Sequence, residues 1–395
     1  MTRRSPWKRV FRGIEPLPGN QMRLLQGGGE FFPALIEACD AARFEIHLET
    51  YIFNADASAL GVRDALVRAA RRGVRVRVLI DGVGSRDLPA DWLAVMREAG
   101  VAVLVYRPLV AGWRANPHSL RRLHRKIAVV DAVVAFVGGI NLIDDFAPVR
   151  LPEPRLDFSV EVRGPLLAPI HAGVHRLWRL VALTQLKTTR REPHVQPSWP
   201  TNGRVRAAFV VRDNFAHRRD IERGYLAALA LARREVCIAN AYFLPGRRFR
   251  KLLRHAAARG VRVRLLVQGH TDHPFFQTAA RALYRDLLAA GVAIHEHHAG
   301  ELHAKVAVID GRWATVGSSN IDPFSLLLAR EANVVVDDAE FAQALQQRLD
   351  RACAAAPALD PADWQRRPWP RRMLSWLAYG AVRVMAGLAG GGRWP

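Results

Sequence analysis

Apolar and polar residues follow two regular spacings along this chain. In some stretches apolar residues recur every three or four positions, which indicates amphipathic helices, and in others they alternate with polar residues or run together, which indicates strands. The elements predicted in the first half are helices at 31–42, 60–72 and 91–98 and strands at 44–53, 74–82 and 101–106. Because helices and strands take turns, the pattern predicts an α/β fold with a largely parallel or mixed sheet.

The second half of the chain repeats the pattern of the first. Residues 234–243 match 43–53 in character, and residues 259–269 match 72–82. The first half has a basic insertion just before its main motif, and this insertion contains Trp113. Since specificity often resides in loops, we expect this loop to contact substrate, with plain surface variation as the alternative.

One motif, H-x-K-x-x-x-x-D, occurs once in each half at the start of an apolar strand. Its members are His124, Lys126 and Asp131 in the first half and His303, Lys305 and Asp310 in the second. Residues two apart on a strand share a face, so each histidine should point the same way as its lysine. Each aspartate lies an odd number of residues from its histidine, so we expect it to face away, near a turn, in a structural role.

Two small residues and an asparagine follow each motif. Gly139 precedes Asn141 in the first half, and Ser318 precedes Asn320 in the second. Small residues let a ligand approach the backbone, so each half offers an imidazole, an ammonium group and a carboxamide on one surface. A lone histidine on an apolar strand is usually a core or edge residue, but the doubled pattern favours a functional site.

Each half also has a carboxylate at the start of a later apolar strand, Asp157 in the first half and Glu331 in the second. A carboxylate that accepts the second ring N–H of a histidine fixes its tautomer and raises its basicity. The alternative is that each residue simply begins a strand in solvent.

The net charge and the cysteine content indicate the kind of binding partner and the redox compartment of the protein. The 395 residues carry a net charge of +22, which favours polyanionic partners such as nucleic acid or an anionic membrane surface. The three cysteines are scattered, which indicates core positions in a reducing compartment rather than disulfides or a metal site. The histidine-rich stretch 295–298 is expected to be a strand edge, and no metal site is predicted.

The two ends of the chain differ from its regular middle. The N-terminus is basic and lacks the apolar region of a signal peptide, and no run of about 20 apolar residues predicts a membrane span. The stretch 366–394 combines arginines with apolar and aromatic residues, which favours an interfacial helix, with packing on the protein's own core as the alternative. The predicted boundaries are an N-terminal segment 1–20, a first repeat 21–185, a linker 186–205, a second repeat 206–352 and a tail 353–395.

The paired motifs resemble those of the phospholipase D superfamily. That resemblance implies two homologous α/β repeats packed as a pseudo-dimer within one chain, with both motifs around one phosphodiester site at their interface. It also favours the orienting role for Asp157 and Glu331. The implied site residues are His124, Lys126, Asp131, His303, Lys305 and Asp310 as the catalytic motifs, Asn141, Asn320 and Ser318 at the phosphate, and Asp157 and Glu331 behind the histidines.

These groups predict a reaction that needs no metal or other cofactor. The lysines and asparagines would neutralise the phosphoryl oxygens. One histidine would attack phosphorus to give a phosphohistidine, while the other would protonate the leaving oxygen and later deprotonate the acceptor. We favour His124 as nucleophile and His303 as acid and base. Gly139 stands where the superfamily often has serine, which puts a hydroxyl contact to phosphate in doubt in the first half.

Other stretches are similar to bacterial cardiolipin synthases, namely 48–53, 316–323 and 331–334. The stretches 212–214, 217, 220–222 and 239–243 are similar to the B-type synthases, which lack the N-terminal membrane helices of the longer form. The similarity implies transfer of a phosphatidyl group between two phosphatidylglycerol molecules, by a peripheral enzyme on the cytoplasmic side of the inner membrane. The alternatives are a hydrolase that releases phosphatidic acid, a nuclease, which the tail disfavours, and a non-catalytic scaffold, which the intact motifs disfavour.

Overall fold

The computed structural model describes residues 16–108, 121–147, 151–186, 203–213, 216–270 and 273–390. The predicted substrate loop around Trp113, the N-terminal segment up to residue 15, the linker residues 187–202 and the last five residues lie outside these ranges. The first half contains β1 (Leu17–Gln26), α1 (Gly27–Ala41), β2 (Glu45–Thr50), α2 (Ala57–Arg71), β3 (Arg75–Asp81), α3 (Ala90–Glu98), β4 (Ala102–Tyr106), β5 (Lys126–Val130), β6 (Val134–Gly138), β7 (Phe158–Arg163) and α4 (Leu167–Thr184).

The second half repeats this succession and adds helices at its end. It contains β8 (Val205–Arg212), α5 (Asp220–Leu231), β9 (Glu235–Asn240), α6 (Arg247–Ala258), β10 (Arg262–Gln268), α7 (Pro274–Arg281), α8 (Tyr284–Ala289), β11 (Ala293–His297), β12 (Lys305–Ile309), β13 (Trp313–Gly317), α9 (Pro323–Leu327), β14 (Glu331–Asp337), α10 (Ala339–Ala354), α11 (Pro361–Gln365) and α12 (Trp369–Gly390). Every helix and strand predicted in the first half is present within a few residues of its expected bounds.

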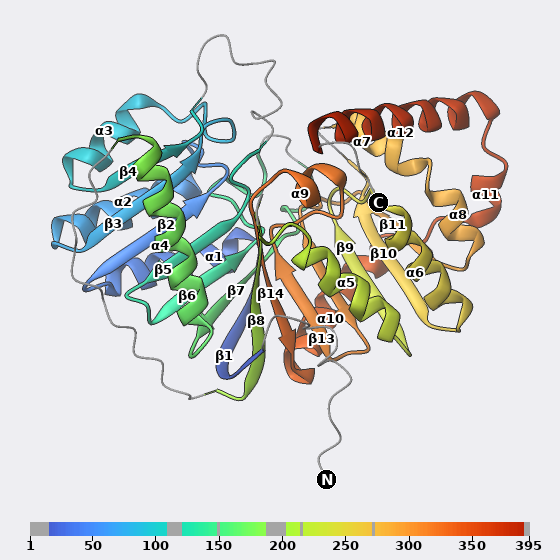
Figure 1. Ribbon diagram of the computed structural model, residues 1–395, viewed down its shortest axis with the longest axis horizontal. Coiled ribbons are helices and arrows are strands. Elements are labelled where there is room, and N and C mark those ends of the chain that lie inside the picture. Colours follow the sequence, from blue (N-terminus) through green and yellow to red (C-terminus); the bar gives the residue numbers. More distant parts are fainter. Residues whose placement is uncertain are drawn as a thin grey trace.

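The described strands form a single 14-stranded sheet with the order β11-β10-β9-β12-β13-β14-β8-β1-β7-β6-β5-β2-β3-β4. Read outward from the central β8–β1 pair, the two sides match strand for strand, and the two halves lie side by side (Figure 1). Strands β2, β3 and β4 are parallel, as are β9, β10 and β11, whereas the motif strands β5 and β12 pair antiparallel with their neighbours. The predicted mixed α/β sheet of two homologous repeats is confirmed.

Both motif strands are buried on both faces, which explains their continuous apolar sequence. In β5, Ile127 and Val129 join a core built from both halves, whereas Ala128 and Val130 join the core beneath the first-half helices. Strand β12 alternates in the same way between the shared core and the core of the second half. The shared core holds the halves together, so the two motifs are fixed relative to each other.

The C-terminal tail begins inside a helix, because α10 extends to Ala354 and its residue Cys353 is buried. The predicted boundary at 353 therefore falls within a packed element. Helix α12 packs along α7 across one end of the second half (Figure 1), with Tyr379 and Val382 among its buried residues. Its opposite side is exposed and apolar. Within the described part of the chain, no helix combines the length and the apolar character that crossing a bilayer requires.

The cysteines and the histidine-rich stretch occupy the kinds of position that the sequence predicts. All three cysteines are buried and unoxidised, although Cys237 of β9 and Cys353 of α10 lie in hydrogen-bond contact despite their separation in sequence. Strand β11, which includes His295 and His297, forms one edge of the sheet.

Candidate active site

Each motif histidine is joined through its backbone to the opposite half of the molecule. The His124 N–H donates to the carbonyl of Arg330 at 2.9 Å, and the His303 N–H donates to the carbonyl of Leu156 at 2.9 Å. Isolated bridges Leu123–Arg330 and Leu156–Leu302 accompany these bonds. The two motifs therefore meet where segments of one half lie against segments of the other.

The side chains of the histidines cross the same boundary. His124 Nδ1 lies 2.9 Å from Glu331 Oε1, and His303 Nδ1 lies 2.5 Å from Asp157 Oδ2. An ionised carboxylate only accepts, so with Glu331 and Asp157 ionised Nδ1 carries the proton in each ring and Nε2 keeps its lone pair. Asp157 and Glu331 are buried rather than in solvent, and each contacts the histidine of the other half rather than the one in its own half.

Burial and neighbouring cations hold both imidazoles neutral. Burial lowers the pKa of His124, although the Glu331 carboxylate partly offsets this effect. The pKa of His303 falls well below its usual value because the ring is buried and faces Lys305, Arg155 and Lys126. Burial also raises the pKa of Asp157 to about 7. Either Nε2 lone pair is thus available for attack in the ligand-free site.

The motif lysines lie in the same buried region. Each Nζ donates to the carbonyl oxygen of its own histidine, at 2.7 Å for Lys126, and Lys305 makes the equivalent contact with His303. Burial lowers the pKa of Lys126 to about 7 and that of Lys305 to about 8, with Glu331 and Asp157 acting in the opposite direction. The two lysines suit an anionic ligand, because a bound phosphoryl group would raise their pKa values again and so stabilise the charged ammonium forms.

Asp131 and Asp310 belong to the motif but lie away from the histidines. Asp131 adopts φ 51° and its carboxylate accepts the backbone N–H groups of residues 43–45 at 2.7–2.8 Å. Asp310 adopts φ 56° and accepts those of residues 233–235. These contacts match the structural role that the spacing of the two aspartates indicates, and their inclusion among the catalytic residues remains a prediction.

Ser318 binds a carboxylate rather than facing an open phosphate site. Its fully buried hydroxyl donates to Glu331 Oε2 at 2.5 Å and accepts the Ala332 N–H at 3.0 Å. The first half has Gly139 at this place. A Cβ on Gly139 would lie 2.7 Å from Asp157 Oδ2 and 2.8 Å from its Cγ, and closer still to Oδ1. In each half the small residue lies beside the carboxylate behind the histidine, and phosphate binding by Ser318 remains a prediction.

The two asparagines differ in their contacts. Asn141 Oδ1 accepts the Ile52 N–H at 3.0 Å, so part of this side chain fixes the loop after β2. Asn320 is 4 % exposed, and its Oδ1 has no hydrogen-bond partner among the described residues. Phosphate binding by both remains a prediction.

Comparisons with known proteins agree with this geometry. The model of the family described as "Cardiolipin synthase, PLD-like domain" matches residues 35–145 and 225–353. Cardiolipin synthase B of Escherichia coli K12 is 40% identical over 385 residues, which cover 94% of this chain and 90% of that protein. The chain belongs to the cardiolipin synthase family. Cardiolipin synthase 1 of Bacillus anthracis is 29% identical, over 89% of this chain and 70% of that protein.

Solved structures support the fold of this cardiolipin synthase family member. Phosphatidylserine synthase of Haemophilus influenzae superposes with a TM-score of 0.72 at 14% identity, covering 97% of this chain and 99% of that one. Polyphosphate kinase of Porphyromonas gingivalis gives a TM-score of 0.52 at 15% identity, over 84% and 50% of the two chains. At these identities the similarity establishes the fold of the paired repeats.

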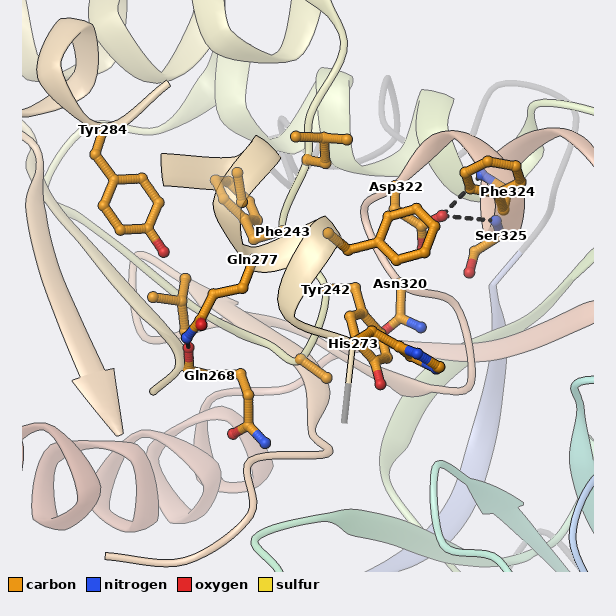
Figure 2. Close-up of a pocket in the computed structure, with 15 residues that line it drawn as sticks. Tyr242, Phe243, Gln268, His273, Gln277, Tyr284, Asn320, Asp322, Phe324 and Ser325 are labelled. Atoms are coloured by element: carbon orange, nitrogen blue, oxygen red, sulfur yellow. Dashed lines mark hydrogen bonds between the residues drawn. The ribbon is translucent and has the colours of Figure 1, made fainter. Parts of the chain in front are cut away.

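An apolar cavity of about 190 Å³ adjoins the second half of the site. Tyr242, Phe243, Phe276 and Phe324 line it, and Asn320 lies at one side beside Tyr242 and His273 (Figure 2). A cavity with largely apolar and aromatic walls and a few polar groups among them suits an amphiphilic ligand. The cavity lies among elements of the second half alone, beneath α7.

Two aromatic and cationic neighbours of the histidines were missed in the sequence. The Tyr51 ring lies 5.0 Å from the His124 ring and 5.4 Å from the Lys126 Nζ, measured to ring centroids. Arg155, which pairs with Glu301, contributes to the lowered pKa of His303. Both residues lie next to stretches that the sequence analysis singled out: Tyr51 directly follows β2, and Arg155 lies two residues before Asp157. Only the fold shows that their side chains point toward the histidines.

Proposed function

We propose that this protein is a cardiolipin synthase, which transfers the phosphatidyl group of one phosphatidylglycerol to a hydroxyl of a second and releases glycerol. The observation that carries the proposal is the pair of His–carboxylate contacts across the interface, His124 with Glu331 and His303 with Asp157, in a member of this family. Neither half alone has a complete set of groups for the reaction.

In the first half-reaction, His124 Nε2 attacks phosphorus. The P–O bond to glycerol breaks, and the leaving oxygen takes a proton from His303 Nε2. Binding the anionic phosphodiester between two lysines opposes the positive field around His303, which restores part of its pKa and its capacity to donate. The Nδ1–H bonds to Glu331 and Asp157 keep both rings oriented throughout.

In the second half-reaction, the hydroxyl of another phosphatidylglycerol replaces glycerol. His303, now neutral, removes the hydroxyl proton, the oxygen attacks phosphorus, and the bond to His124 breaks. Lys126, Lys305, Asn141 and Asn320 donate to the phosphoryl oxygens as their charge grows in the transition state.

The membrane surface is the expected location of this reaction. Helix α12 exposes Trp369, Met373, Leu377, Val384 and Leu388, which recur at helical spacing along one side. Arginines precede and begin this helix at positions 366, 367, 371 and 372. An apolar stripe with adjacent arginines suits peripheral binding to anionic lipid, and α12 lies on α7, which borders the cavity. The proposal includes a position on the cytoplasmic side of the inner membrane.

The test is to incubate the purified chain with phosphatidylglycerol vesicles and to identify the lipid products by mass spectrometry. Cardiolipin and free glycerol in equal amounts are expected, and both should be absent with His124→Ala or His303→Ala. Phosphatidic acid without cardiolipin would overturn the synthase assignment in favour of hydrolysis. Replacing both Leu374 and Leu377 by aspartate should reduce turnover on vesicles but not on detergent-dispersed phosphatidylglycerol, because only vesicle binding needs the exposed stripe.

A further inference from the structure

A second group of histidines lies outside the catalytic site, between α4 and β2. His171 and His175 are one turn apart on α4, and Glu45 and His47 share one face of β2. Glu45, His47 and His171 are buried, and the His175 side chain is 15% exposed. Helix α4 runs across the strands of the first half (Figure 1), so the cluster joins a helix to the sheet.

The donor atoms of these side chains converge on one point. His171 Nε2 lies 2.6 Å from Glu45 Oε1 and 2.9 Å from His175 Nε2, and His175 Nε2 lies 3.4 Å from Glu45 Oε1. Two imidazole nitrogens that face each other can share only one proton. Glu45 Oε2 is buried and accepts no hydrogen bond within the described part of the chain; His47 Nε2 at 3.6 Å and Arg75 Nη1 at 3.9 Å face it beyond hydrogen-bond distance.

We propose that Glu45, His171 and His175 bind a zinc-class divalent cation. Zinc bonds of 2.0–2.2 Å to nitrogen and oxygen place tetrahedral ligands roughly 3.3 Å apart, so these donors need to move by only a few tenths of an ångström. Two histidines at i and i+4 on one helix with a carboxylate from a neighbouring element form a common zinc ligand set. Water takes the fourth position.

The surrounding charges select the kind of ion. Arg75 Nη1 lies 3.9 Å from Glu45 Oε2, and Arg77 Nη1 lies 3.4 Å from His47 Nε2. These arginines oppose a cation that is held by charge alone, such as Mg²⁺ or Ca²⁺. An ion that bonds strongly to imidazole nitrogen, such as Zn²⁺ or Co²⁺, gains enough from the two histidines to overcome that repulsion.

The ion would stabilise the fold rather than take part in catalysis. Glu45 lies beside Asp131, just beyond the end of β5 that is opposite to Lys126, so the site is roughly 17 Å along the strand from the motif lysine. The Gly173 carbonyl, between the two histidines on α4, accepts from Arg125 Nη2 at 3.2 Å. Fixing α4 would therefore also fix the residue next to His124. This inference does not depend on the proposed function.

The experiment uses the untagged full-length chain, stripped with a chelator and then titrated with Co²⁺ or Zn²⁺. One ion per chain is expected, with the intense visible absorption of four-coordinate cobalt and a higher melting temperature in zinc. His171→Ala with His175→Ala should abolish both effects, while His298→Ala, an exposed histidine outside the cluster, should retain them.

Glu45→Gln is a second test in case the double histidine variant fails to fold, because it removes the charge of one ligand and leaves the side-chain volume nearly unchanged. It should keep the circular dichroism spectrum of the parent and weaken cobalt binding at least tenfold. No stoichiometric uptake by the parent chain, or unchanged uptake by the His171→Ala, His175→Ala protein, would overturn the proposal.

Discussion

The two His–carboxylate pairs perform the same task with different parts. Glu331 contacts His124 and also accepts a hydrogen bond from the Ser318 hydroxyl. Asp157, whose side chain is one methylene shorter, lies in the space beside Gly139. The carboxylate and the small residue behind it therefore have complementary sizes in each half. The comparison teaches that the glycine in the first motif is a fitted partner of Asp157 rather than a lost phosphate contact.

The largest effects should come from removing either histidine, and the comparison predicts that the two losses differ in kind. Both His124→Ala and His303→Ala should lower cardiolipin formation by about 10³-fold or more, since acid–base catalysis alone contributes roughly 10²–10⁴-fold. With a phosphodiester that has a nitrophenol leaving group, His303→Ala should still form the phosphohistidine on His124, because that leaving group needs no proton.

The measurement is a burst of nitrophenol, together with peptide mass spectrometry of the modified histidine. His303→Ala should show a burst of one equivalent, and His124→Ala should show none. A burst in His124→Ala with phosphate on His303 would reverse the two roles while leaving the shared site intact.

The next largest loss of activity should come from substituting the small residues beside the two carboxylates, Gly139 and Ser318. Gly139→Ser forces its side chain into Asp157 and should displace the carboxylate from His303, lowering kcat/KM by about 10–100-fold, as for other residues that orient a functional group. Ser318→Gly removes the hydroxyl's hydrogen bonds to Glu331 and to the Ala332 N–H but creates no clash, so it should cost less than about tenfold.

The double variant Gly139→Ser with Asp157→Glu copies the second half into the first. It should recover part of the activity lost in Gly139→Ser, measured as kcat/KM on phosphatidylglycerol in detergent. Full activity of Gly139→Ser alone would contradict the fitted pairing, and thermal melting of each variant separates a local effect from unfolding.

The smallest predicted effect concerns pH. The pKa of Lys126 is lowered to about 7 and that of Lys305 to about 8, so both ammonium groups are fully charged only below these values. We expect kcat/KM, which reports the ionisation of the free enzyme, to fall several-fold between about pH 7 and 9. The fall in kcat should come at higher pH, because the bound phosphate stabilises the charged ammonium groups of the two lysines. In Lys126→Arg the guanidinium stays charged, so its residual activity should decline only around pH 8. An unchanged profile would show that Lys126 is not the titrating group.

Much of the fold was predictable from the sequence because burial on both faces of the motif strands leaves an apolar run that is easy to recognise. The odd number of residues between each histidine and its aspartate also predicted that Asp131 and Asp310 face away from the histidines, as they do. What spacing could not give was the partner of each histidine, because distance along the chain does not say which half's carboxylate meets which ring. The contact of Ser318 with Glu331 could not be predicted for the same reason, since it depends on the pairing of β13 with β14.

The close-packed pair Gly139 and Asp157 lies within one half, whereas the histidine that Asp157 orients belongs to the other. The same holds for Ser318, Glu331 and His124. A whole half could therefore be exchanged between related proteins without separating a carboxylate from the residue that makes room for it. The chain thus consists of two modules whose tightest fits are internal, while the hydrogen bonds between the two histidines and their carboxylates join one module to the other.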